Sequence, residues 1–570
     1  MDSSLGKIAL GAGIGAAVSY YVCTQNLKQP ENVVGNSPTT ATIATTTQSV
    51  RRFRIHHLVE RMEQCFPGNL VALPSFTYLQ FANRVRCAAH AFVHKLALPP
   101  GAKVGVLALN SREYLELYFS LSFAGLVIVP LNFRLGDQEL QDMVSKSNCQ
   151  ALVVDDKHVG TVVGWFPHLK LVMMGKPKTS LPAVVHELEA LLMESPALVV
   201  ARENQEAPDL YGIFYTSGTS GQGSKGVMLS HDGLLINASC LAQAVKINQR
   251  TIYLHCAPMF HVADSTSTFA VSMVGGTHAF VASFHPEPVL SAIEQYGVTH
   301  TLLVPSMFPP LLAHDKFATC NKQTIKYVVY GSSPMPNAVI NHALRVLPDV
   351  KFVQGYGMTE CSPVMTFLLP EHHFAASARM GSVGQCVPHG LLRVCDQATG
   401  DELPRGVVGE IYYRGPNVML GYYNDPVATN KYITREGWLK TGDAGRMDVH
   451  GFLFLADRIN QAISTCNGVV HAAQVESAIR EIPGVLDCAV LGVKQSVGEF
   501  ELVAAVVVVP KPTGDGASQP LTAEAIQREL RPAFELDEFK IPTQIVFTYT
   551  RLPLNAVGKV SKTQLRQYLS

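Results

Sequence analysis

A loop rich in hydroxyl groups and glycines, with one lysine, carries the clearest chemical signal in the chain. It follows an apolar run at residues 210–215, and Ser230 beyond it can cap a helix that begins near His231. Glycines let backbone N–H groups approach an anion, the hydroxyls add donors, and the lysine adds a positive charge. The pattern predicts that a nucleotide triphosphate is bound by Thr216, Ser217, Gly218, Thr219, Ser220, Gly221 and Lys225.

Two other kinds of loop explain less of this pattern. A flexible linker also contains Gly and Ser, but it requires neither a buried strand before it nor a lysine within it. A P-loop has the order Gly, four residues, Gly, Lys, and Ser or Thr. Gly218 and Gly223 have that spacing. The match fails at the next two positions, because Ser224 replaces the lysine and Lys225 is followed by Gly226.

Four further motifs follow the loop: Tyr330-Gly-Ser-Ser-Pro334, Gln354-Gly-Tyr-Gly-Met-Thr-Glu360, Gly437-Trp-Leu-Lys-Thr-Gly-Asp443 and Pro553-Leu-Asn-Ala-Val-Gly-Lys559. With the loop, they resemble the ordered signature sequences of the adenylate-forming superfamily, which includes acyl-CoA synthetases, luciferases and peptide-synthetase adenylation domains. The resemblance covers nearly everything from residue 51 onward. It implies an α/β fold with a large N-terminal domain of mixed and parallel sheets covered by helices, followed by a small mobile α+β C-terminal domain.

The resemblance also implies a complete ATP and Mg²⁺ site. Tyr356 would lie against adenine, Asp443 would accept hydrogen bonds from the ribose hydroxyls, and Arg458 would reinforce the ribose and phosphate contact. Glu360 and Thr216 would supply oxygen ligands to Mg²⁺. Taken alone, Tyr356 would be read as a packed core aromatic and Asp443 as a turn residue. The other implied nucleotide-binding positions are Gly331, Ser332, Ser333 and Gly357.

Three residues are implied to take part in catalysis. A carboxylate resists nucleophiles because its charge is delocalised, and its conversion to an acyl adenylate provides AMP as a leaving group. Lys559 would bridge the substrate carboxylate and the α-phosphate, which repel each other as they approach. Thr359 would contact the α-phosphate. His261 resembles the histidine at the mouth of the acyl pocket, although a buried structural histidine is nearly as good an interpretation.

The leading hypothesis is an ATP-dependent carboxylate:CoA ligase of the 4-coumarate:CoA ligase and fatty acyl-CoA synthetase type, with coenzyme A as co-substrate. The phosphate loop has one extra residue and lacks the usual proline. The family's hinge between the large and small domains corresponds to residues 457–468. Here Asn460 and Gln461 replace charged residues, and Asn467 stands where glycine is usual. Domain rotation about this hinge is needed for thioester formation. Two alternatives therefore stay open: transfer to a carrier protein or oxygen, and a non-catalytic nucleotide-binding protein.

Size and composition limit the other possibilities. A chain of 570 residues, 47% of them hydrophobic, is expected to form at least two domains. We expect them at residues 51–456 and 457–570. Lysine plus arginine and aspartate plus glutamate each total 45, so no basic excess favours nucleic acid. Twelve cysteines without a Cys-x-x-Cys pair favour a reducing, intracellular compartment. His372 and His373 lack zinc-binding spacing and are expected at the surface.

The N-terminal 50 residues form a separate region. Residues 8–23 are apolar and uncharged, slightly short of the ~20 residues of a membrane-spanning helix. A secretory signal fits poorly with an ATP-using enzyme, and a mitochondrial presequence would carry arginines before Arg51. The segment is therefore predicted to be an uncleaved membrane anchor. Residues 31–50, rich in Thr, Ser and Asn, are predicted to be a tether.

Alternating apolar runs predict the elements that position these motifs. In the large domain the predicted strands lie at residues 104–109, 126–131, 151–155, 301–304 and 325–330, with a helix at 113–124. In the small domain the predicted elements are helices at 474–481 and 522–530 and strands at 488–493 and 502–509.

Overall fold

The structure is a computed structural model that describes residues 52–178, 182–198, 200–204, 207–216, 224–374, 377–458, 463–494, 501–511, 521–533, 537–553 and 560–569. The predicted anchor at residues 8–23 and the predicted tether lie outside these ranges. Among the helices within them, none has the length and apolar character needed to span a bilayer.

One large sheet contains eight strands in the described part of the chain, in the order β19-β9-β8-β4-β3-β5-β6-β7. The strands from β8 to β7 run parallel, and β9 and β19 add an antiparallel edge. Parallel strands buried on both faces need apolar runs, which β3, β4, β5, β6 and β8 contain. The bounds are β3 Lys103–Leu107, β4 Val127–Pro130, β5 Cys149–Asp155, β6 Lys170–Met174, β7 Val185–Glu187, β8 Leu210–Thr216, β9 Lys225–Ser230 and β19 Gly421–Tyr422.

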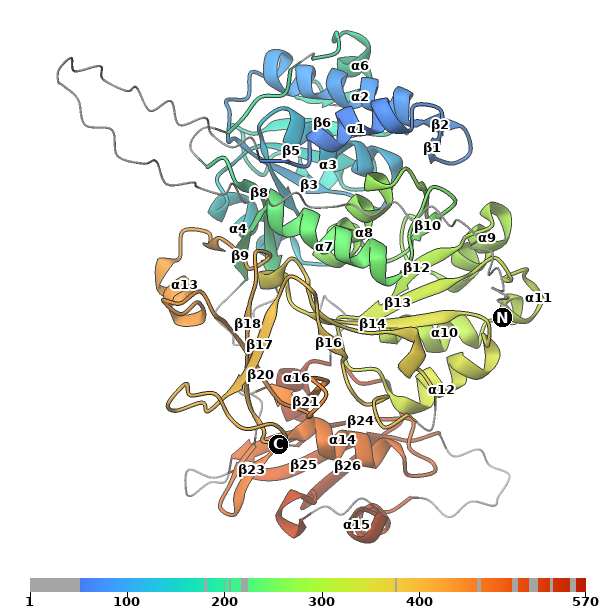
Figure 1. Ribbon diagram of the computed structural model, residues 1–570, viewed down its shortest axis with the longest axis vertical. Helices are drawn as coiled ribbons and strands as arrows, with labels where there is room; N and C mark the ends of the chain where they lie inside the picture. The colour runs from blue at the N-terminus through green and yellow to red at the C-terminus, as the bar shows by residue number, and fades with distance from the viewer. Residues whose placement is uncertain are drawn as a thin grey trace, which may run out of the picture. The chain divides into compact units, whose positions relative to one another are not determined.

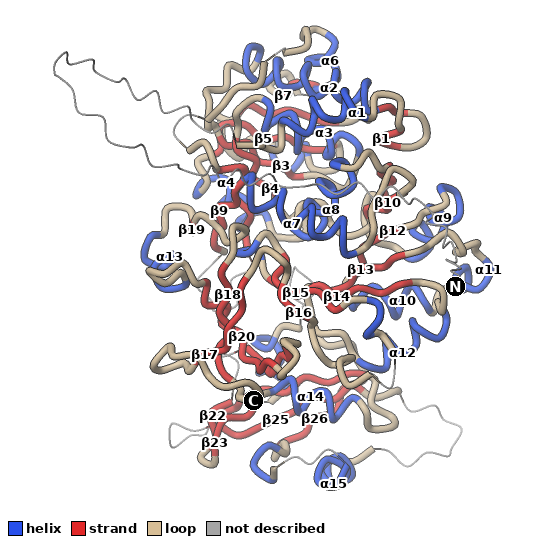
Figure 2. The backbone as a smooth tube through the Cα atoms, in the orientation of Figure 1, coloured by secondary structure: helices blue, strands red, loops and turns tan. Residues whose placement is uncertain are grey.

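A second large sheet has nine strands among the described residues, in the order β16-β15-β14-β13-β12-β10-β11-β1-β2. Its centre is parallel, and β15, β16 and β2 are antiparallel to their neighbours. Figure 2 shows both large sheets in red with helices in blue beside them. The bounds are β1 Leu70–Ala72, β2 Phe76–Thr77, β10 Ile252–His255, β11 Thr277–Phe280, β12 His300–Leu303, β13 Tyr327–Gly331, β14 Lys351–Gly357, β15 Val364–Leu368 and β16 Gln385–Cys386.

Helices cover the two sheets. Figure 1 shows α7 and α8, in green, side by side. The Ser230 hydroxyl accepts a hydrogen bond from the Gly233 N–H at 3.0 Å, which confirms the predicted cap at the start of α7. The bounds are α1 His57–Cys65, α2 Tyr78–His90, α3 Arg112–Phe123, α4 Asp137–Lys146, α5 Val159–Val162, α6 Leu188–Met193, α7 His231–Ala244, α8 Val262–Met273, α9 Pro286–Tyr296, α10 Phe308–Leu312, α11 Asp315–Thr319, α12 Asn337–Val346 and α13 Pro426–Tyr432.

Two smaller groups of elements complete the chain. An antiparallel sheet consists of β17 Leu391–Cys395, β18 Gly409–Arg414, β20 Leu439–Met447 and β21 Leu453–Arg458. The C-terminal elements have their own apolar core, which includes Val475, Ile479, Val503 and Leu530. These elements are β22 Ile463–Thr465, β23 Gly468–Val470, α14 Ala472–Arg480, β24 Asp487–Lys494, β25 Glu501–Val508, α15 Ala523–Ala533, β26 Gln544–Thr548 and α16 Lys562–Leu565. Short π or 3₁₀ turns occupy Ala91–Lys95, Pro305–Met307, Thr359–Cys361, Pro370–His372, Glu538–Lys540 and Arg566–Tyr568.

The predicted fold class is confirmed, and each predicted helix and strand overlaps an observed one. The domain boundary at residues 456 and 457 stays a prediction. One expectation was wrong: the phosphate loop does not lead directly into a helix. A strand, β9, comes first and pairs antiparallel with β8. The run Gly226-Val-Met-Leu229 contains buried Val227 and Leu229, so it contributes to the sheet before α7 begins.

A buried polar chain ties α8 to the second sheet. Because a carboxylate only accepts, His255 Nδ1 donates to Asp264 Oδ2 at 2.6 Å. His255 Nε2 then accepts from His278 Nδ1 at 2.8 Å, and His278 Nε2 accepts from the Ser272 hydroxyl at 3.0 Å. All four side chains are almost inaccessible to solvent. Burial lowers the pKa of His278 well below its ordinary value, which agrees with a neutral imidazole that accepts a hydrogen bond.

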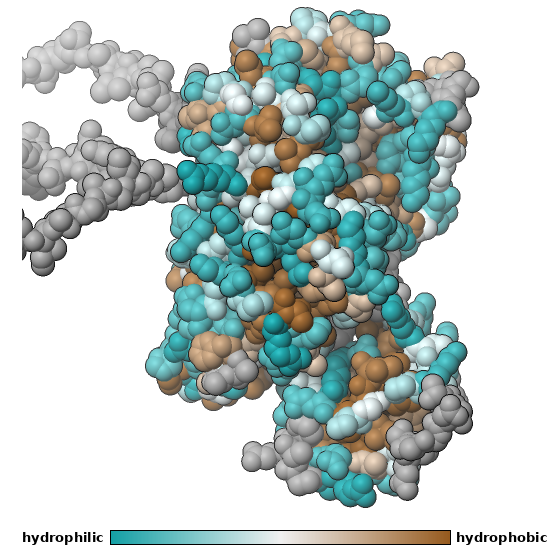
Figure 3. All heavy atoms as spheres, turned by 90° about the vertical axis from the view of Figure 1, so that its right-hand side faces the viewer, coloured by the Kyte–Doolittle hydropathy of each residue, from teal (hydrophilic) through white to brown (hydrophobic). Residues whose placement is uncertain are grey.

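The cysteines of the described residues are mostly buried. The eleven cysteines in the described ranges are all free, and seven of them are buried. On the face drawn in Figure 3, hydrophilic side chains, in teal, cover much of the surface with apolar ones, in brown, between them. The reducing compartment stays a prediction.

Candidate active site

The β8–β9 hairpin places two of the predicted phosphate-binding residues opposite each other. Thr216 and Lys225 are direct register partners at the ends of the two strands. Lys225 Nζ lies 5.1 Å from the ring centroid of Tyr422 and 4.9 Å from that of Tyr432. These two rings meet edge to face, so the aromatic pair holds the ammonium group through cation–π contacts. The predicted residues between the strands, 217–221, lie outside the described ranges.

Glu360 is buried close to this lysine. The hydroxyl of Tyr422 donates to Glu360 Oε1 at 2.7 Å, and only 5% of the Glu360 surface is exposed. Burial, followed by the charge of Glu360, raises the pKa of the Tyr422 phenol, so this hydroxyl keeps its proton. Thr359 precedes Glu360 in the 3₁₀ turn and is half-buried. One tyrosine therefore contacts both the predicted phosphate-binding cation and the predicted metal ligand.

Two buried asparagines, which the sequence did not single out, fix this turn. Asn237 Nδ2 and Asn417 Nδ2 both donate to the carbonyl oxygen of Cys361, at 2.8 and 2.6 Å. The Ser362 hydroxyl donates to the Asn417 carbonyl at 2.9 Å, and the Tyr413 hydroxyl donates to Asn417 Oδ1 at 2.7 Å. The available signal was an amide at 237 directly after the apolar run Leu234-Leu235-Ile236, since buried amides usually satisfy other buried groups.

Tyr356 and Asp443, predicted to bind adenosine, are in direct contact. The Tyr356 hydroxyl donates to Asp443 Oδ2 at 2.8 Å, and each residue is 9% exposed. Burial and the charge of Asp443 raise the pKa of Tyr356 well above its ordinary value, so the phenol acts as a donor. Arg458 on β21 is the backbone register partner of Asp443 on β20. The fold thus brings together three residues that are distant in sequence.

Close backbone packing accounts for two of the predicted glycines. A Cβ atom on Gly331 would lie 2.2 Å from the carbonyl oxygen of Gly355, its partner on β14. A Cβ atom on Gly357 would lie 1.9 Å from the carbonyl oxygen of Pro363. Ser332 has a φ of 69°, a left-handed conformation that is uncommon for a residue with a side chain. Ser332 is exposed, and Ser333 beside it is half-buried.

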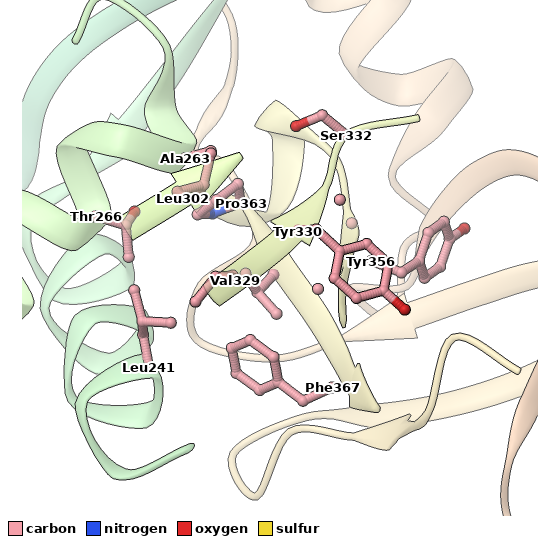
Figure 4. Close-up of a pocket in the computed structure, with 14 residues that line it drawn as sticks. Leu241, Ala263, Thr266, Leu302, Val329, Tyr330, Ser332, Tyr356, Pro363 and Phe367 are labelled. Atoms are coloured by element: carbon pink, nitrogen blue, oxygen red, sulfur yellow. The ribbon is translucent and has the colours of Figure 1, made fainter. Parts of the chain in front are cut away.

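A pocket lies beside Tyr356, at the ends of β12 to β15 and against α7 and α8. In Figure 4, Leu241, Val329 and Phe367 lie near one another, whereas Ser332 lies apart from them. The lining residues are Leu241, Ala263, Thr266, Leu302, Val329, Tyr330, Gly331, Ser332, Gly355, Tyr356, Gly357, Pro363, Val364 and Phe367. Four of the predicted nucleotide-site residues therefore also border an apolar pocket.

His261 is not among the residues that line this pocket. It immediately precedes α8, and its backbone carbonyl accepts from the N–H groups of Asp264 and Ser265. Its ring lies 5.2 Å from that of Phe260, centroid to centroid. The two pocket residues on the same helix are Ala263 and Thr266. A catalytic role for His261 stays a prediction.

The expectation that His373 lies at the surface was wrong. Its side chain is buried, and its Nδ1 must donate to the Leu369 carbonyl, at 2.9 Å. Nε2 therefore accepts from the hydroxyl of Tyr330, a pocket residue, at 3.0 Å. Burial lowers the pKa of His373 to about 4. His372 is half-buried and packs edge-on against Phe452.

No cluster of three potential metal-binding side chains occurs in the described ranges.

The structure describes only part of the predicted hinge and does not describe the lysine predicted to be catalytic. Asn460, Gln461 and Lys559 lie outside the described residues. Asn467 is exposed at the turn between β22 and β23, where its N–H donates to the Thr465 hydroxyl at 3.3 Å.

Comparison with protein families accounts for this arrangement. The model of AMP-binding enzymes matches residues 65–423, and the model of the AMP-binding enzyme C-terminal domain matches residues 474–559. The chain belongs to the AMP-binding enzyme family. This assignment confirms the resemblance on which the expected fold and enzyme class were based.

Individual family members are similar over most of the chain. A feruloyl-CoA synthase from Amycolatopsis sp is 32% identical over 495 residues, which cover 86% of this chain and 94% of that protein. A fatty acid–[acyl-carrier-protein] ligase, ScoC, from Streptomyces coeruleorubidus is 29% identical and covers 88% and 93%. The crystal structure of ATP-bound MatB from Rhodopseudomonas palustris superimposes with a TM-score of 0.78 at 26% identity, covering 90% and 99%.

Gly357→Ala should destabilise the protein, because its methyl group would meet the Pro363 carbonyl oxygen at 1.9 Å. We expect a loss of roughly 2–4 kcal/mol in the free energy of unfolding, measured by chemical denaturation. Gly355→Ala on the same strand is the matched control. Its methyl group would lie 3.6 Å from the Phe367 ring and 3.9 Å from Val364, which are ordinary contacts, and should cost less than about 1 kcal/mol. Equal losses in the two variants would contradict the packing explanation.

His373→Gln should make the protein less sensitive to acid. The pKa of His373 falls from 6.5 to about 4 on folding. The unfolded chain therefore binds the proton more tightly, and stability that is complete above about pH 6.5 is lost as pH falls towards 4. Glutamine does not titrate, so the variant lacks this dependence of stability on pH. The variant should lose on the order of 1–2 kcal/mol less between pH 7 and pH 5 in urea denaturation. His372→Gln is the control, and identical losses in all three proteins would refute the assignment.

Proposed function

We propose that this protein is an ATP-dependent carboxylate:CoA ligase, an AMP-forming acid–thiol ligase. The observation that carries the proposal is the apolar pocket that shares Gly331, Tyr356 and Gly357 with the predicted nucleotide site. An acid bound in this pocket would present its carboxylate where the nucleotide's α-phosphate is expected. The feruloyl-CoA synthase and the other relatives named as CoA ligases support the same class of reaction.

The nucleotide would be held at both of its ends. Asp443, oriented by Tyr356, would accept hydrogen bonds from the ribose hydroxyls, and Arg458 would strengthen this contact. The hairpin residues Thr216 and Lys225, with the residues between them, would bind the phosphates. The cation–π contacts of Lys225 keep a positive charge at the end of the hairpin without neutralising it.

Glu360 and Thr216 are the proposed ligands of Mg²⁺. A carboxylate and a hydroxyl are hard oxygen donors that suit this ion, and Mg²⁺ usually needs only one or two protein carboxylates beside substrate phosphates. The buried position of Glu360 in a turn fixed by Asn237 and Asn417 fits such a role. When bound, the ion would neutralise the charge that develops on the phosphates.

The reaction would proceed in two displacements. An oxygen of the acid's carboxylate forms a bond to the α-phosphorus of ATP, the bond to the β-phosphate breaks, and pyrophosphate leaves. The CoA thiolate then attacks the acyl carbon, and AMP leaves with the electrons of the broken bond. Lys559 would lower the repulsion between the two anions in the first step, and Thr359 would contact the α-phosphate.

A carrier protein is the second candidate acceptor. Asn460 and Gln461 alter the hinge that the second step requires, and the similar ScoC is named as an acyl-carrier-protein ligase. Addition of CoA or of a carrier protein to the isolated enzyme-bound acyl adenylate distinguishes these two acceptors. AMP should be released rapidly only when the true acceptor is added.

Attachment to a membrane through residues 8–23 is a separate part of this proposal. Removal of residues 1–50 should then move the protein from the membrane pellet to the supernatant, whereas continued sedimentation would exclude this anchor.

Lys559→Ala should slow adenylate formation by about 10²–10³-fold, the usual effect of removing one electrostatic contact from a transition state. Pyrophosphate release with a panel of carboxylic acids measures this step. Lys562→Ala is the matched control, since Lys562 is a nearby lysine whose Nζ lies 3.5 Å from Glu476. Similar rates in both variants would refute the role of Lys559. Absence of CoA-dependent AMP release with every acid would refute the proposed function.

A further inference from the structure

The apolar pocket contains few groups that could receive a polar substituent. Of the fourteen residues that line it, all within the described ranges, seven are apolar, three are glycines and none is charged. Its walls are formed mainly by Leu241, Leu302, Val329, Val364 and Phe367. The remaining polar side chains are Thr266, Tyr330, Ser332 and Tyr356.

Thr266 is already engaged within the protein. Its hydroxyl lies 2.9 Å from the Val262 carbonyl and 3.3 Å from the Ser362 carbonyl. A hydroxyl has one hydrogen, which these two acceptors share, and the side chain is 1% exposed. Thr266 therefore has no hydrogen left to donate to a ligand.

Tyr330 and Tyr356 are engaged in the same way. The Tyr330 hydroxyl donates to His373 Nε2 at 3.0 Å and also lies 3.3 Å from Gln354 Oε1. The Tyr356 hydroxyl donates to Asp443 at 2.8 Å. The hydrogens of both hydroxyls are therefore engaged by these partners within the protein. Ser332 is exposed and lies apart from Leu241, Val329 and Phe367 in Figure 4, so it cannot serve the far end of the pocket.

We infer that the pocket selects carboxylic acids whose tails carry neither hydroxyl nor charged groups, namely aliphatic or unsubstituted aryl acids. The inference rests on the proposed function. A hydroxyl buried without a partner loses its hydrogen bonds to water, and a buried carboxylate loses still more. The pocket therefore discriminates between acids because its far end, near Leu241, Val329 and Phe367, has no side-chain hydrogen-bond partner for a polar substituent. The size of the pocket is not the basis of this discrimination.

Two matched pairs of acids test this inference in the full-length protein. 3-Phenylpropanoate should exceed 3-(4-hydroxyphenyl)propanoate in kcat/KM by about 10- to 100-fold, the usual effect of an added hydroxyl in an apolar site. Octanoate should exceed octanedioate by at least about 100-fold, because the second carboxylate is charged. Equal or better use of the hydroxylated acid or of the diacid would overturn the inference.

Val329→Thr tests the mechanism of selection. The change adds one hydroxyl to the pocket wall with almost no change of volume, and it should lower the preference for 3-phenylpropanoate several-fold. Val328→Thr is the matched control, because Val328 is also buried on the same strand but does not line the pocket. The same preference in the two variants would contradict selection by the wall.

Binding measurements separate this inference from the proposed function. Isothermal titration of each acid, with a non-hydrolysable ATP analogue present, reports the preference without turnover. The predicted order of affinities without any thioester product would support the pocket inference and refute the ligase activity. Thioester formation without the predicted order of affinities would support the ligase activity and refute the pocket inference.

Discussion

Two buried amide side chains, Asn237 and Asn417, hold the turn on which both halves of the site depend. The turn connects β14 to β15, and the carbonyl oxygen of Cys361 accepts from both amides. Before it lie Tyr356 and Gly357, and within it lies Glu360. A buried carbonyl without partners would cost free energy, so the amides make this one conformation of the turn favourable. The residues proposed to contact the nucleotide, the metal and the acid thus share one support.

The sequence predicted the fold well because its signals were local. Apolar runs identified β3, β4, β5, β12 and β13, and Ser230 identified the start of α7. The motif resemblance also selected residues that the fold brings together, such as Tyr356 and Asp443, which are separated by 87 positions. Periodicity alone does not specify such a contact, since it arises from the pairing of whole strands.

The features that the sequence did not predict correctly also have physical causes. Strand β9 was overlooked because Lys225 and Gly226 were read as parts of a loop, although Val227 and Leu229 are buried beyond them. The lack of zinc-binding spacing led to the expectation that His373 lies at the surface, but spacing does not report burial. Two hydrogen bonds, with Leu369 and Tyr330, compensate for its burial. Asn417 gave no signal, because the Cys361 carbonyl oxygen that it satisfies lies 56 positions away.

The aromatic ring of Tyr422 separates a cation from an anion. Its face carries the ammonium group of Lys225, and its hydroxyl contacts the carboxylate of Glu360. Displacement of this ring would disturb both charges together, so the two residues form one thermodynamic unit. The free-energy effects of altering them singly are therefore not expected to sum to the effect of altering both.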